Sequence, residues 1–561
     1  NVETLLPGNV PGSGRKPLFP FLLILFTVLV FAPSLPYGFL TDWDDHAFIV
    51  ENPLLVPTLA HIRTLLTSTF QDLYTPLPML SFMADKALFG LNPVAFRAEN
   101  LFWHILSALF LYGILRELHF RDIPAFVAAL LWAIHPQKAE SVVWITERKD
   151  VLCGAFFFAS LFFFLRSLRR EKVPVAATLC GLLALASKPA ALPLPGIMIV
   201  SAICLYGRKR PLAAYGKVLL LPLLAYCGMI LYSFFVTAKG FPGGMENRFL
   251  VVFHNLFWYP VTALLPFELN PMYPNLKEWA RRSFFLVPGV SGTFLVLFFL
   301  YRSIAVKRIF WTFFFVTGGC MIPVLGFLNY TAMDFCDRYN YLVSACVLAF
   351  VLSGVENGLF RHPEKRKTVY FLLFLYAAVF ALRTFTYLPV WKNCDELFTY
   401  AVRNGRPANH AALENGVMSA VKSSNASLLR EFAYLMRSDH DAFFPQDEHL
   451  LHTALFLTAH ADLVEGKREE AFSHYLALAQ LIMKGELDLM RPKEFLPVLM
   501  RGGAETSLLA NSPASALFFF REYFKVKKEH SREYFYMREK YRALLETLKK
   551  RPREQGKNNA I

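Results

Sequence analysis

The sequence is poor in cysteine and in charge, and both shortages exclude classes of protein. It holds 8 Cys among 561 residues, none of them in a CxxC pair, so neither a zinc site nor a disulfide scaffold is indicated. Only 18% of the residues are charged, whereas 55% are hydrophobic. With a mean hydropathy of +0.37, this composition excludes a soluble globular protein.

Apolar segments of membrane-spanning length are abundant instead. Aromatic residues make up 16% of the chain, including 56 Phe, and apolar runs recur from Leu18 to Val390. The first run lacks a following A-x-A-like cleavage site, so we expect it to remain as a helix. The pattern predicts an all-α polytopic membrane protein with about eleven helices. Their approximate ranges are 18–35, 99–116, 122–136, 151–166, 173–187, 189–206, 218–237, 284–301, 309–328, 340–357 and 369–388.

The distribution of positive charge predicts an orientation. The chain has 58 Lys+Arg against 43 Asp+Glu, and in a membrane protein this excess indicates loops facing anionic cytoplasmic lipid, not nucleic acid. If the helices alternate, the cytoplasmic loops are all basic. These loops are 116–121, 166–172, 208–217, 302–308 and 361–367. The tail of residues 1–17 is then cytoplasmic, and the region after Trp391 lies outside the cytoplasm.

One segment breaks this alternation. Residues 250–270 are apolar but interrupted by Pro260 and Pro266. A full crossing there would move every later basic loop to the other side of the membrane. We therefore expect this segment to be re-entrant or to lie at the interface.

The sequence changes character after Asp395. Hydropathy falls, and helix-period patterns alternate with short polar breaks. One pair of segments, 455–463 and 469–482, has a helical-hairpin rhythm that resembles a tetratricopeptide repeat. Its marker residues are Ala459, Gly466, Ala471 and Tyr475. We expect a membrane domain at 18–390 with outer loops at 36–98 and 136–150, a degenerate TPR-like domain at 391–548, and a charged tail at 549–561.

Two adjacent carboxylates follow the first predicted span. Asp44 and Asp45 lie where the chain leaves the bilayer. Neighbouring acids repel, so one of them could hold its proton more tightly, or both could bind a cation; either arrangement suits deprotonation of a hydroxyl. The alternative is a solvated turn or a helix N-cap.

A second cluster joins two predicted spans and contains more chemistry than a connector needs. Its ionisable residues are His135, Lys138, Glu140, Glu147, Arg148, Lys149 and Asp150. The acids could orient the histidine or hold the basic pair, and the basic pair can bind a phosphate that develops charge as it leaves. The alternative is interfacial anchoring by Trp with snorkelling basic side chains.

Three further positions are candidates. His104 lies in an apolar helix, where an ionisable side chain is costly, although a hydrogen-bonded buried histidine is the alternative. Lys188 joins two spans on the outer side, and Arg338 and Tyr339 precede another span there. Together with the basic pair they would form a cationic floor for a lipid phosphate, or each would be a snorkelling anchor.

A series of motifs occurs in order between about residues 40 and 417. They are DWDDHAFIVENPLL, YTPLPMLSF, GLNPVAFRAENLFWHILSALF, HPQKAESVVWITERKDVL, SKPAALPLPG, DRYNYL and WKNCDELFTYAVRNGRPANHAALENGV. Their order and spacing resemble the bacterial relatives of the transmembrane and tetratricopeptide-repeat O-mannosyltransferases, within the GT-C superfamily of polyprenyl-phosphate-sugar glycosyltransferases.

The resemblance implies an enzyme that moves a sugar from a polyprenyl monophosphate to an acceptor hydroxyl on the non-cytoplasmic face. The membrane would be a bacterial inner membrane, with the C-terminal domain in the periplasm. No cofactor would be required, which fits the lack of a Gly-rich phosphate loop. A Mg²⁺ or Mn²⁺ ion, if one took part, would bind Asp44 and Asp45. The usual C-terminal repeats are reduced here to one hairpin, so the acceptor could be a protein, a lipid or a glycan.

Carried over by position, the resemblance and the clusters give two sets of site residues. The catalytic candidates, in which one of the two aspartates is the presumed base, are Asp44, Asp45, His135 and Glu140. The candidates for binding the donor and its lipid phosphate are His104, Arg148, Lys149, Asp150, Lys188, Arg338 and Tyr339.

Two other functions would use the same features. A flippase or transporter of lipid-linked sugars would also carry ionisable residues in its spans, but it would need them deep within several helices. A membrane-anchored repeat scaffold would leave the acids merely solvated.

Overall fold

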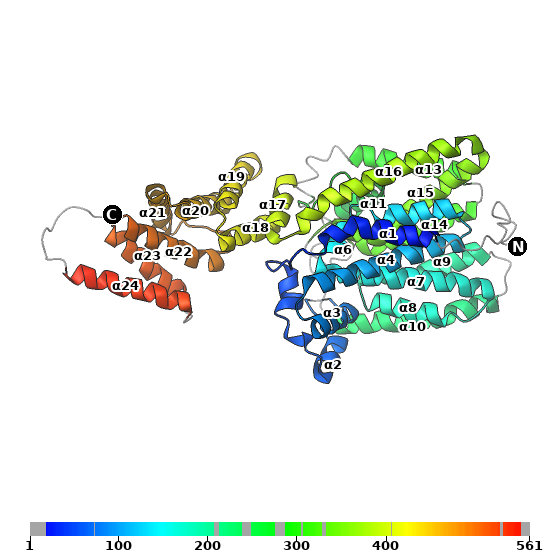
Figure 1. Cartoon of the computed structure of the whole chain (residues 1–561), viewed down its shortest axis with the longest axis horizontal. Helices are drawn as coiled ribbons and strands as arrows, with labels where there is room; N and C mark the ends of the chain where they lie inside the picture. Colours follow the sequence, from blue (N-terminus) through cyan, green and yellow to red (C-terminus); the bar gives the residue numbers. More distant parts are fainter. Residues whose placement is uncertain are drawn as a thin grey trace. The chain divides into compact units, whose positions relative to one another are not determined.

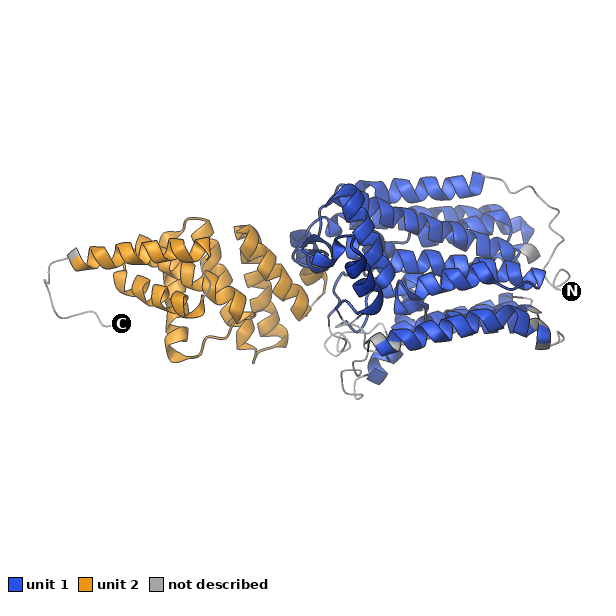
Figure 2. Ribbon diagram, turned by 90° about the horizontal axis from the view of Figure 1, so that it is seen from below, with its two compact units in different colours: residues 1–400 blue, residues 401–561 orange. Residues whose placement is uncertain are grey.

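The computed structural model describes residues 18–71, 73–206, 212–237, 248–274, 276, 286–304, 307–327, 333–405, 407–527 and 531–550. Within these ranges the chain is helical and forms no β-strand, as the sequence predicts. The predicted tail at 1–17, nearly all of the tail at 549–561, and parts of the basic loops 208–217 and 302–308 lie outside the described residues. The chain divides into two compact units, residues 1–400 and 401–561 (Figure 2).

Twelve long helices make up most of the described part of unit 1 (Figure 1). They are α1 (Leu18–Phe31), α4 (Pro93–Glu117), α5 (Asp122–Ala133), α7 (Arg148–Arg170), α8 (Val175–Leu185), α9 (Leu194–Tyr206), α10 (Leu212–Thr237), α11 (Arg248–Leu264), α13 (Leu286–Ser303), α14 (Lys307–Met321), α15 (Asn340–Arg361) and α16 (Arg366–Tyr387). All except α11 fall on a predicted span. Among the described residues, five helical segments are long and apolar enough to cross a membrane, and six other apolar helices are shorter. The chain is therefore an integral membrane protein, and the number of crossings stays a prediction.

The segment expected to be re-entrant or interfacial forms α11. This helix continues through Pro260 and ends at Leu264, two residues before Pro266. It packs on α13 and α15 within the bundle. Pro260 therefore does not break the helix. The position of α11 relative to the bilayer stays a prediction.

The predicted outer loops are themselves largely helical. The first contains a π-helical turn, η3 (His46–Val50), and the helices α2 (Leu59–Thr67) and α3 (Pro76–Phe89). The second contains α6 (Lys138–Val143) and the 3-10 turn η5 (Ile145–Glu147). In Figure 1, α2, α3 and α6 lie at the same end of the bundle. A buried apolar cluster, which includes Phe48, Leu65 and Ile145, joins the two loops.

Unit 2 is a series of helices in which each packs on the next. They are α18 (His410–Ser423), α19 (Ala426–Phe443), α20 (Glu448–Val464), α21 (Arg468–Lys484), α22 (Pro492–Leu509), α23 (Pro513–Val526) and α24 (Arg532–Lys550), preceded by α17 (Cys394–Asn404) at the boundary. The predicted hairpin is α20–α21: Gly466 turns the chain at a positive φ, and Ala459, Ala471 and Tyr475 are buried between the helices. Its assignment as a tetratricopeptide repeat stays a prediction.

Candidate functional site

The two adjacent aspartates have different surroundings. Asp45 is fully buried, and its carboxylate accepts hydrogen bonds from the backbone N–H of Leu40 (2.9 Å), from the backbone N–H of Thr146 (3.0 Å) and from the Thr146 hydroxyl. These bonds tie the first outer loop to the second. Burial raises the pKa of Asp45, although the hydrogen bonds oppose the shift. With both oxygens engaged by the protein, Asp45 is a structural link between the loops.

Asp44, in contrast, is half-buried, and its side chain makes no hydrogen bond or ion pair to any residue within the described ranges. Burial raises its pKa, with a smaller upward contribution from the negative charge of Glu147. The positive charges of Lys149 and Arg338 act in the opposite direction. Asp44 is thus a carboxylate that faces a charged cluster and still has both oxygens available for a proton or a substrate.

The charged cluster centres on Arg338, in the 3-10 turn η9 (Asp337–Tyr339). Its backbone N–H donates to Glu140 Oε2 (2.8 Å), and its guanidinium Nη1 contacts Glu140 Oε1. Its Nε lies 3.6 Å from Glu147 Oε1, and its Cζ lies 5.5 Å from the centre of the Trp144 ring. Glu140 therefore fixes both the backbone and the side chain of Arg338. Burial raises the pKa of Glu140 to about 7, although Arg338 opposes the shift.

Two lysines complete this cluster. Lys149 Nζ lies 3.2 Å from Glu147 Oε1, and Lys188 Nζ lies 3.3 Å from Glu147 Oε2. Lys188 also pairs with Asp150 Oδ1 at 2.6 Å and lies 5.8 Å from the centre of the Tyr339 ring. Three bases and three acids therefore lie together beside Asp44. Glu140 comes from α6, Glu147 from η5, Lys149 and Asp150 from the start of α7, Lys188 from the connection between α8 and α9, and Arg338 from η9.

Arg148 lies outside this cluster, although it is the neighbour of Lys149. Its guanidinium is fully buried between α3 and α4, 2.6 Å from Asp85 Oδ2 and 2.9 Å from Glu99 Oε2. Nε donates to Asn100 Oδ1 (2.8 Å) and Nη2 to the carbonyl of Phe96 (2.7 Å). Its donor groups are engaged by the protein, so Arg148 is placed to hold helices together and not to bind a phosphate.

The two candidate histidines are also engaged by the protein. His135 Nε2 lies 3.1 Å from the carbonyl of Ala263, and its Nδ1 accepts the backbone N–H of Gln137 at 3.3 Å. The ring therefore links the second loop to α11. In α4, the His104 ring bonds to the hydroxyl of Tyr341 and to the carbonyl of Ala133, each at 2.8 Å. Neither ring has a nitrogen left for a substrate.

The two aspartates do not fit a shared divalent cation. Both oxygens of Asp45 already accept hydrogen bonds, so only Asp44 could offer a ligand. Across the described ranges, no three His, Cys, Asp or Glu side chains are grouped so that they could hold a metal ion. The described residues around Asp44 and Asp45 therefore do not fit a Mg²⁺ or Mn²⁺ ion.

Three tryptophans form a stack beside the cluster, which sequence reasoning missed. The Trp43 and Trp144 rings are parallel with centroids 4.0 Å apart, and Trp391 lies 6.1 Å from Trp144. Trp43 directly precedes Asp44, and Trp144 lies between Glu140 and Glu147 in the second cluster, but nothing in the sequence indicates that Trp391 meets them. The stack packs the residue before Asp44 against the second loop.

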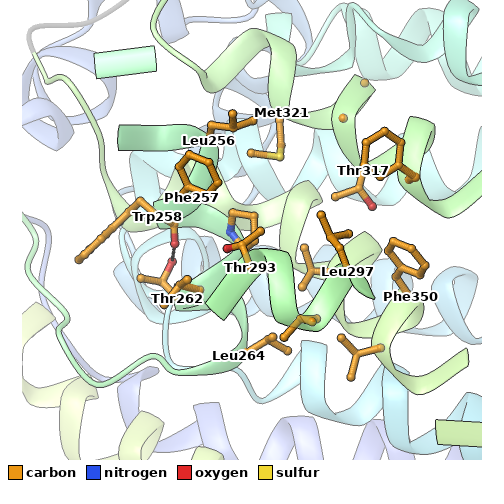
Figure 3. Close-up of a pocket in the computed structure, with 18 of the residues that line it drawn as sticks. Leu256, Phe257, Trp258, Thr262, Leu264, Thr293, Leu297, Thr317, Met321 and Phe350 are labelled. Carbon is orange, nitrogen blue, oxygen red and sulfur yellow. Dashed lines mark hydrogen bonds between the residues drawn. The ribbon is translucent and has the colours of Figure 1, made fainter. Parts of the chain in front are cut away.

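A cavity of about 1010 Å³ lies between α9, α11, α13, α14 and α15. Its lining is mostly apolar and includes Leu256, Phe257, Leu297, Met321 and Phe350, with a few hydroxyls such as those of Thr262, Thr293 and Thr317 (Figure 3). The hydroxyl of Thr262 also accepts a hydrogen bond from Asn340 Nδ2 (3.2 Å), two residues after Arg338. One wall of the cavity is therefore in contact with the turn that carries the charged cluster.

Comparison with known proteins finds several relatives that share the name protein O-mannosyl-transferase. The chain is 39% identical over 107 residues to "Protein O-mannosyl-transferase TMTC1" of Mus musculus, which covers 19% of this chain and 11% of that protein. It is 28% identical over 250 residues to TMTC4 of Homo sapiens (39% and 34%) and 26% identical over 184 residues to TMTC3 of Homo sapiens (31% and 20%), both also named protein O-mannosyl-transferases.

The chain is similar to protein O-mannosyl-transferases. It spans about a third or less of the length of these three relatives. No protein-family model and no solved structure matches it.

Proposed function

We propose that this protein is a membrane glycosyltransferase that moves a sugar from a polyprenyl-phosphate donor to an acceptor hydroxyl. The observation that carries the proposal is the carboxylate of Asp44, which has no hydrogen-bond partner among the described residues and faces Lys149 and Arg338. A base next to cations is the arrangement needed to deprotonate a hydroxyl beside a leaving phosphate. The similarity to proteins named for O-mannosyl transfer supports the same reaction class.

The donor phosphate would bind at Arg338, Lys149 and Lys188. Each of these cations already pairs with an acid, so an incoming phosphate adds negative charge to a balanced cluster. Glu140 is suited to compensate, because its pKa of about 7 lets it take up a proton near neutral pH. Protonation of Glu140 would weaken its hold on the guanidinium and leave Arg338 freer to bind the phosphate.

The transfer step then follows from the positions of the groups. Asp44 accepts the proton of the acceptor hydroxyl as that oxygen forms a bond to the anomeric carbon of the sugar. The bond between the anomeric carbon and the phosphate oxygen breaks, and its electron pair leaves with the polyprenyl phosphate. Lys149, Lys188 and Arg338 stabilise that leaving charge. Direct displacement of this kind inverts the anomeric carbon.

The prenyl chain would occupy the apolar cavity. This cavity is lined by helices of the bundle and contacts the turn of Arg338 through Thr262 and Asn340. A lipid tail held there has its phosphate directed towards the charged cluster. For the acceptor, the names of the relatives favour a protein Ser or Thr hydroxyl. We place the site on the non-cytoplasmic side, with residues 1–17 cytoplasmic and unit 2 extracytoplasmic.

The test uses the purified full chain in phospholipid vesicles, supplied with radiolabelled polyprenyl-phosphate-mannose and an extract of membrane and secreted proteins. We expect label to appear on protein and to be released by mild alkali, as O-linked sugars on Ser or Thr are. Polyprenyl-diphosphate-mannose and GDP-mannose serve as control donors, and we expect no transfer of mannose from either of them. Transfer from GDP-mannose alone, or movement of intact donor across the vesicle membrane without transfer, would contradict the proposal.

The pH dependence of transfer should respond to Lys149. The positive charge of Lys149 lowers the pKa of Asp44, so Lys149→Met raises that pKa. Because Asp44 acts in its ionised form, the limb on which activity rises with pH should move to higher pH. Lys392→Met, which changes an exposed lysine outside the cluster, should leave the limb in place. If the limb stays unchanged or moves to lower pH in Lys149→Met, then Asp44 is not the group whose ionisation produces it.

A further inference from the structure

Helix α2 exposes large apolar side chains, although it is not among the candidate membrane spans. Leu59 is 87% exposed and Leu66 is 42% exposed, and Val56, three residues before the helix, is 51% exposed. Leu59 and Leu66 are seven residues apart, so they lie on one face of the helix, with Arg63 beside them. An apolar stripe next to a basic side chain is typical of a helix that lies on a lipid surface.

The other sides of α2 have different surroundings. Leu65 is buried, and Ile62 packs against the same apolar cluster, so one side holds the helix on the protein. The exposed side chains of Thr64 and Thr67 lie on a polar side. The helix therefore has three sides, one packed on the protein, one polar and exposed, and one apolar and exposed.

Contact with α10 gives the level of α2 relative to the bilayer. The hydroxyl of Tyr232 donates to the carbonyl of Leu66 (3.2 Å), and its ring lies 5.5 Å from that of Tyr74. Tyr232 lies near the end of a segment, Tyr215–Ser233, that is long and apolar enough to cross a membrane, and Leu231 beside it is exposed. Tyrosines concentrate at membrane–water interfaces. The apolar side of α2 thus continues the lipid-facing surface of α10.

We propose that α2 lies along the bilayer surface, with Leu59 and Leu66 at the boundary between headgroups and acyl chains and Arg63 at the level of the lipid phosphates. The partner is the phospholipid surface itself. The inference does not depend on the proposed sugar transfer.

Contact between α2 and the lipid surface would also position the first outer loop, which carries Asp44 and Asp45. Leu65 belongs to the same buried cluster as Phe48 and Ile49, and these two residues lie in the π-helical turn that directly follows Asp45. A helix fixed on the lipid surface therefore holds that turn at a constant depth. Any lipid headgroup that reaches the charged cluster does so at a level set by α2.

The test measures the depth of two positions on α2. A dansyl-bearing amino acid is incorporated at Leu59 or at Thr64, about 140° away around the helix, in the full chain. Each protein is reconstituted into phosphatidylcholine–phosphatidylglycerol vesicles that contain lipids with a nitroxide either near the headgroup or deep in the acyl chain. We expect several-fold stronger quenching at Leu59 than at Thr64, and stronger quenching by the shallow nitroxide than by the deep one.

Two results would overturn the proposal. Equal quenching at Leu59 and Thr64 would mean that α2 has no lipid-facing side. Stronger quenching by the deep nitroxide at Leu59 would place the helix inside the bilayer. Both positions are exposed, so neither substitution removes a buried contact, and circular dichroism of the reconstituted protein checks that the fold is retained.

Discussion

Asp44→Asn should lower the rate of sugar transfer by about 10²–10⁴-fold while the protein folds and binds its donor normally. The amide has nearly the shape of the carboxylate but cannot accept the proton of the acceptor hydroxyl. Because the Asp44 side chain makes no hydrogen bond within the described parts of the chain, the substitution breaks no internal hydrogen bond. The loss should therefore fall on kcat and leave the KM for the donor nearly unchanged.

The matched variant is Asp45→Asn, one residue away. Its amide presents an N–H₂ group where the carboxylate accepts a donor from Leu40 or Thr146, so one buried donor is left without a partner. We expect this variant to lose about 1–3 kcal/mol of stability, seen as a lower melting temperature in detergent. Wild-type transfer rates in Asp44→Asn, together with a folded but inactive Asp45→Asn, would show that the base is the other aspartate.

Arg148→Met should destabilise the fold by about 3–5 kcal/mol, because it leaves the buried Asp85 and the partly buried Glu99 without their cation. Asp85 pairs with Arg148 at 2.6 Å and Glu99 at 2.9 Å. Burial raises the pKa of Asp85 to about 7, so its charge already depends on Arg148 for compensation. We expect little folded protein in fluorescence-detected size-exclusion chromatography, and a lower melting temperature for any that remains.

Replacing all three members of that ion cluster provides the control for folding. Arg148→Met combined with Asp85→Leu and Glu99→Leu removes the charges together, so it should recover part of the lost stability. Lys149→Met, at the next residue, should fold well and bind donor weakly. If Arg148→Met keeps wild-type stability but loses donor affinity, then Arg148 binds the phosphate, as the pair of basic residues in the sequence indicates.

The sequence was sufficient to predict the helices and to indicate the two loop regions that the structure brings together in the candidate site. Apolar runs long enough to span a bilayer leave little choice of backbone structure, because every backbone polar group there needs an internal partner. A helix lies in each predicted range for the same reason. The sequence also indicated Asp44 and Asp45 as a pair, but it could not show their different surroundings. That difference depends on Thr146, about a hundred residues further along the chain.

Arg148 and Lys149 show a second limit of the sequence. Consecutive residues on a helix point in directions about 100° apart, so two adjacent bases at the start of α7 reach different surroundings. The motif indicates two cations, yet only the packing of α3 and α4 shows that one of them is enclosed. His104 and His135 are candidates because of their residue type and position in the sequence. Their partners in the structure, a tyrosine hydroxyl and backbone carbonyls, carry no sequence signal.

The first turn of α7 places a buried ion-paired anchor, Arg148, directly before Lys149, the lysine that we propose binds the donor phosphate. Since Arg148 fastens this turn to α3 and α4, the ammonium of Lys149 has little freedom to follow a donor of another size. Redesign for a longer or shorter lipid carrier would therefore best begin at the apolar walls around Leu297 and Phe350, where side-chain volume can change without disturbing that anchor.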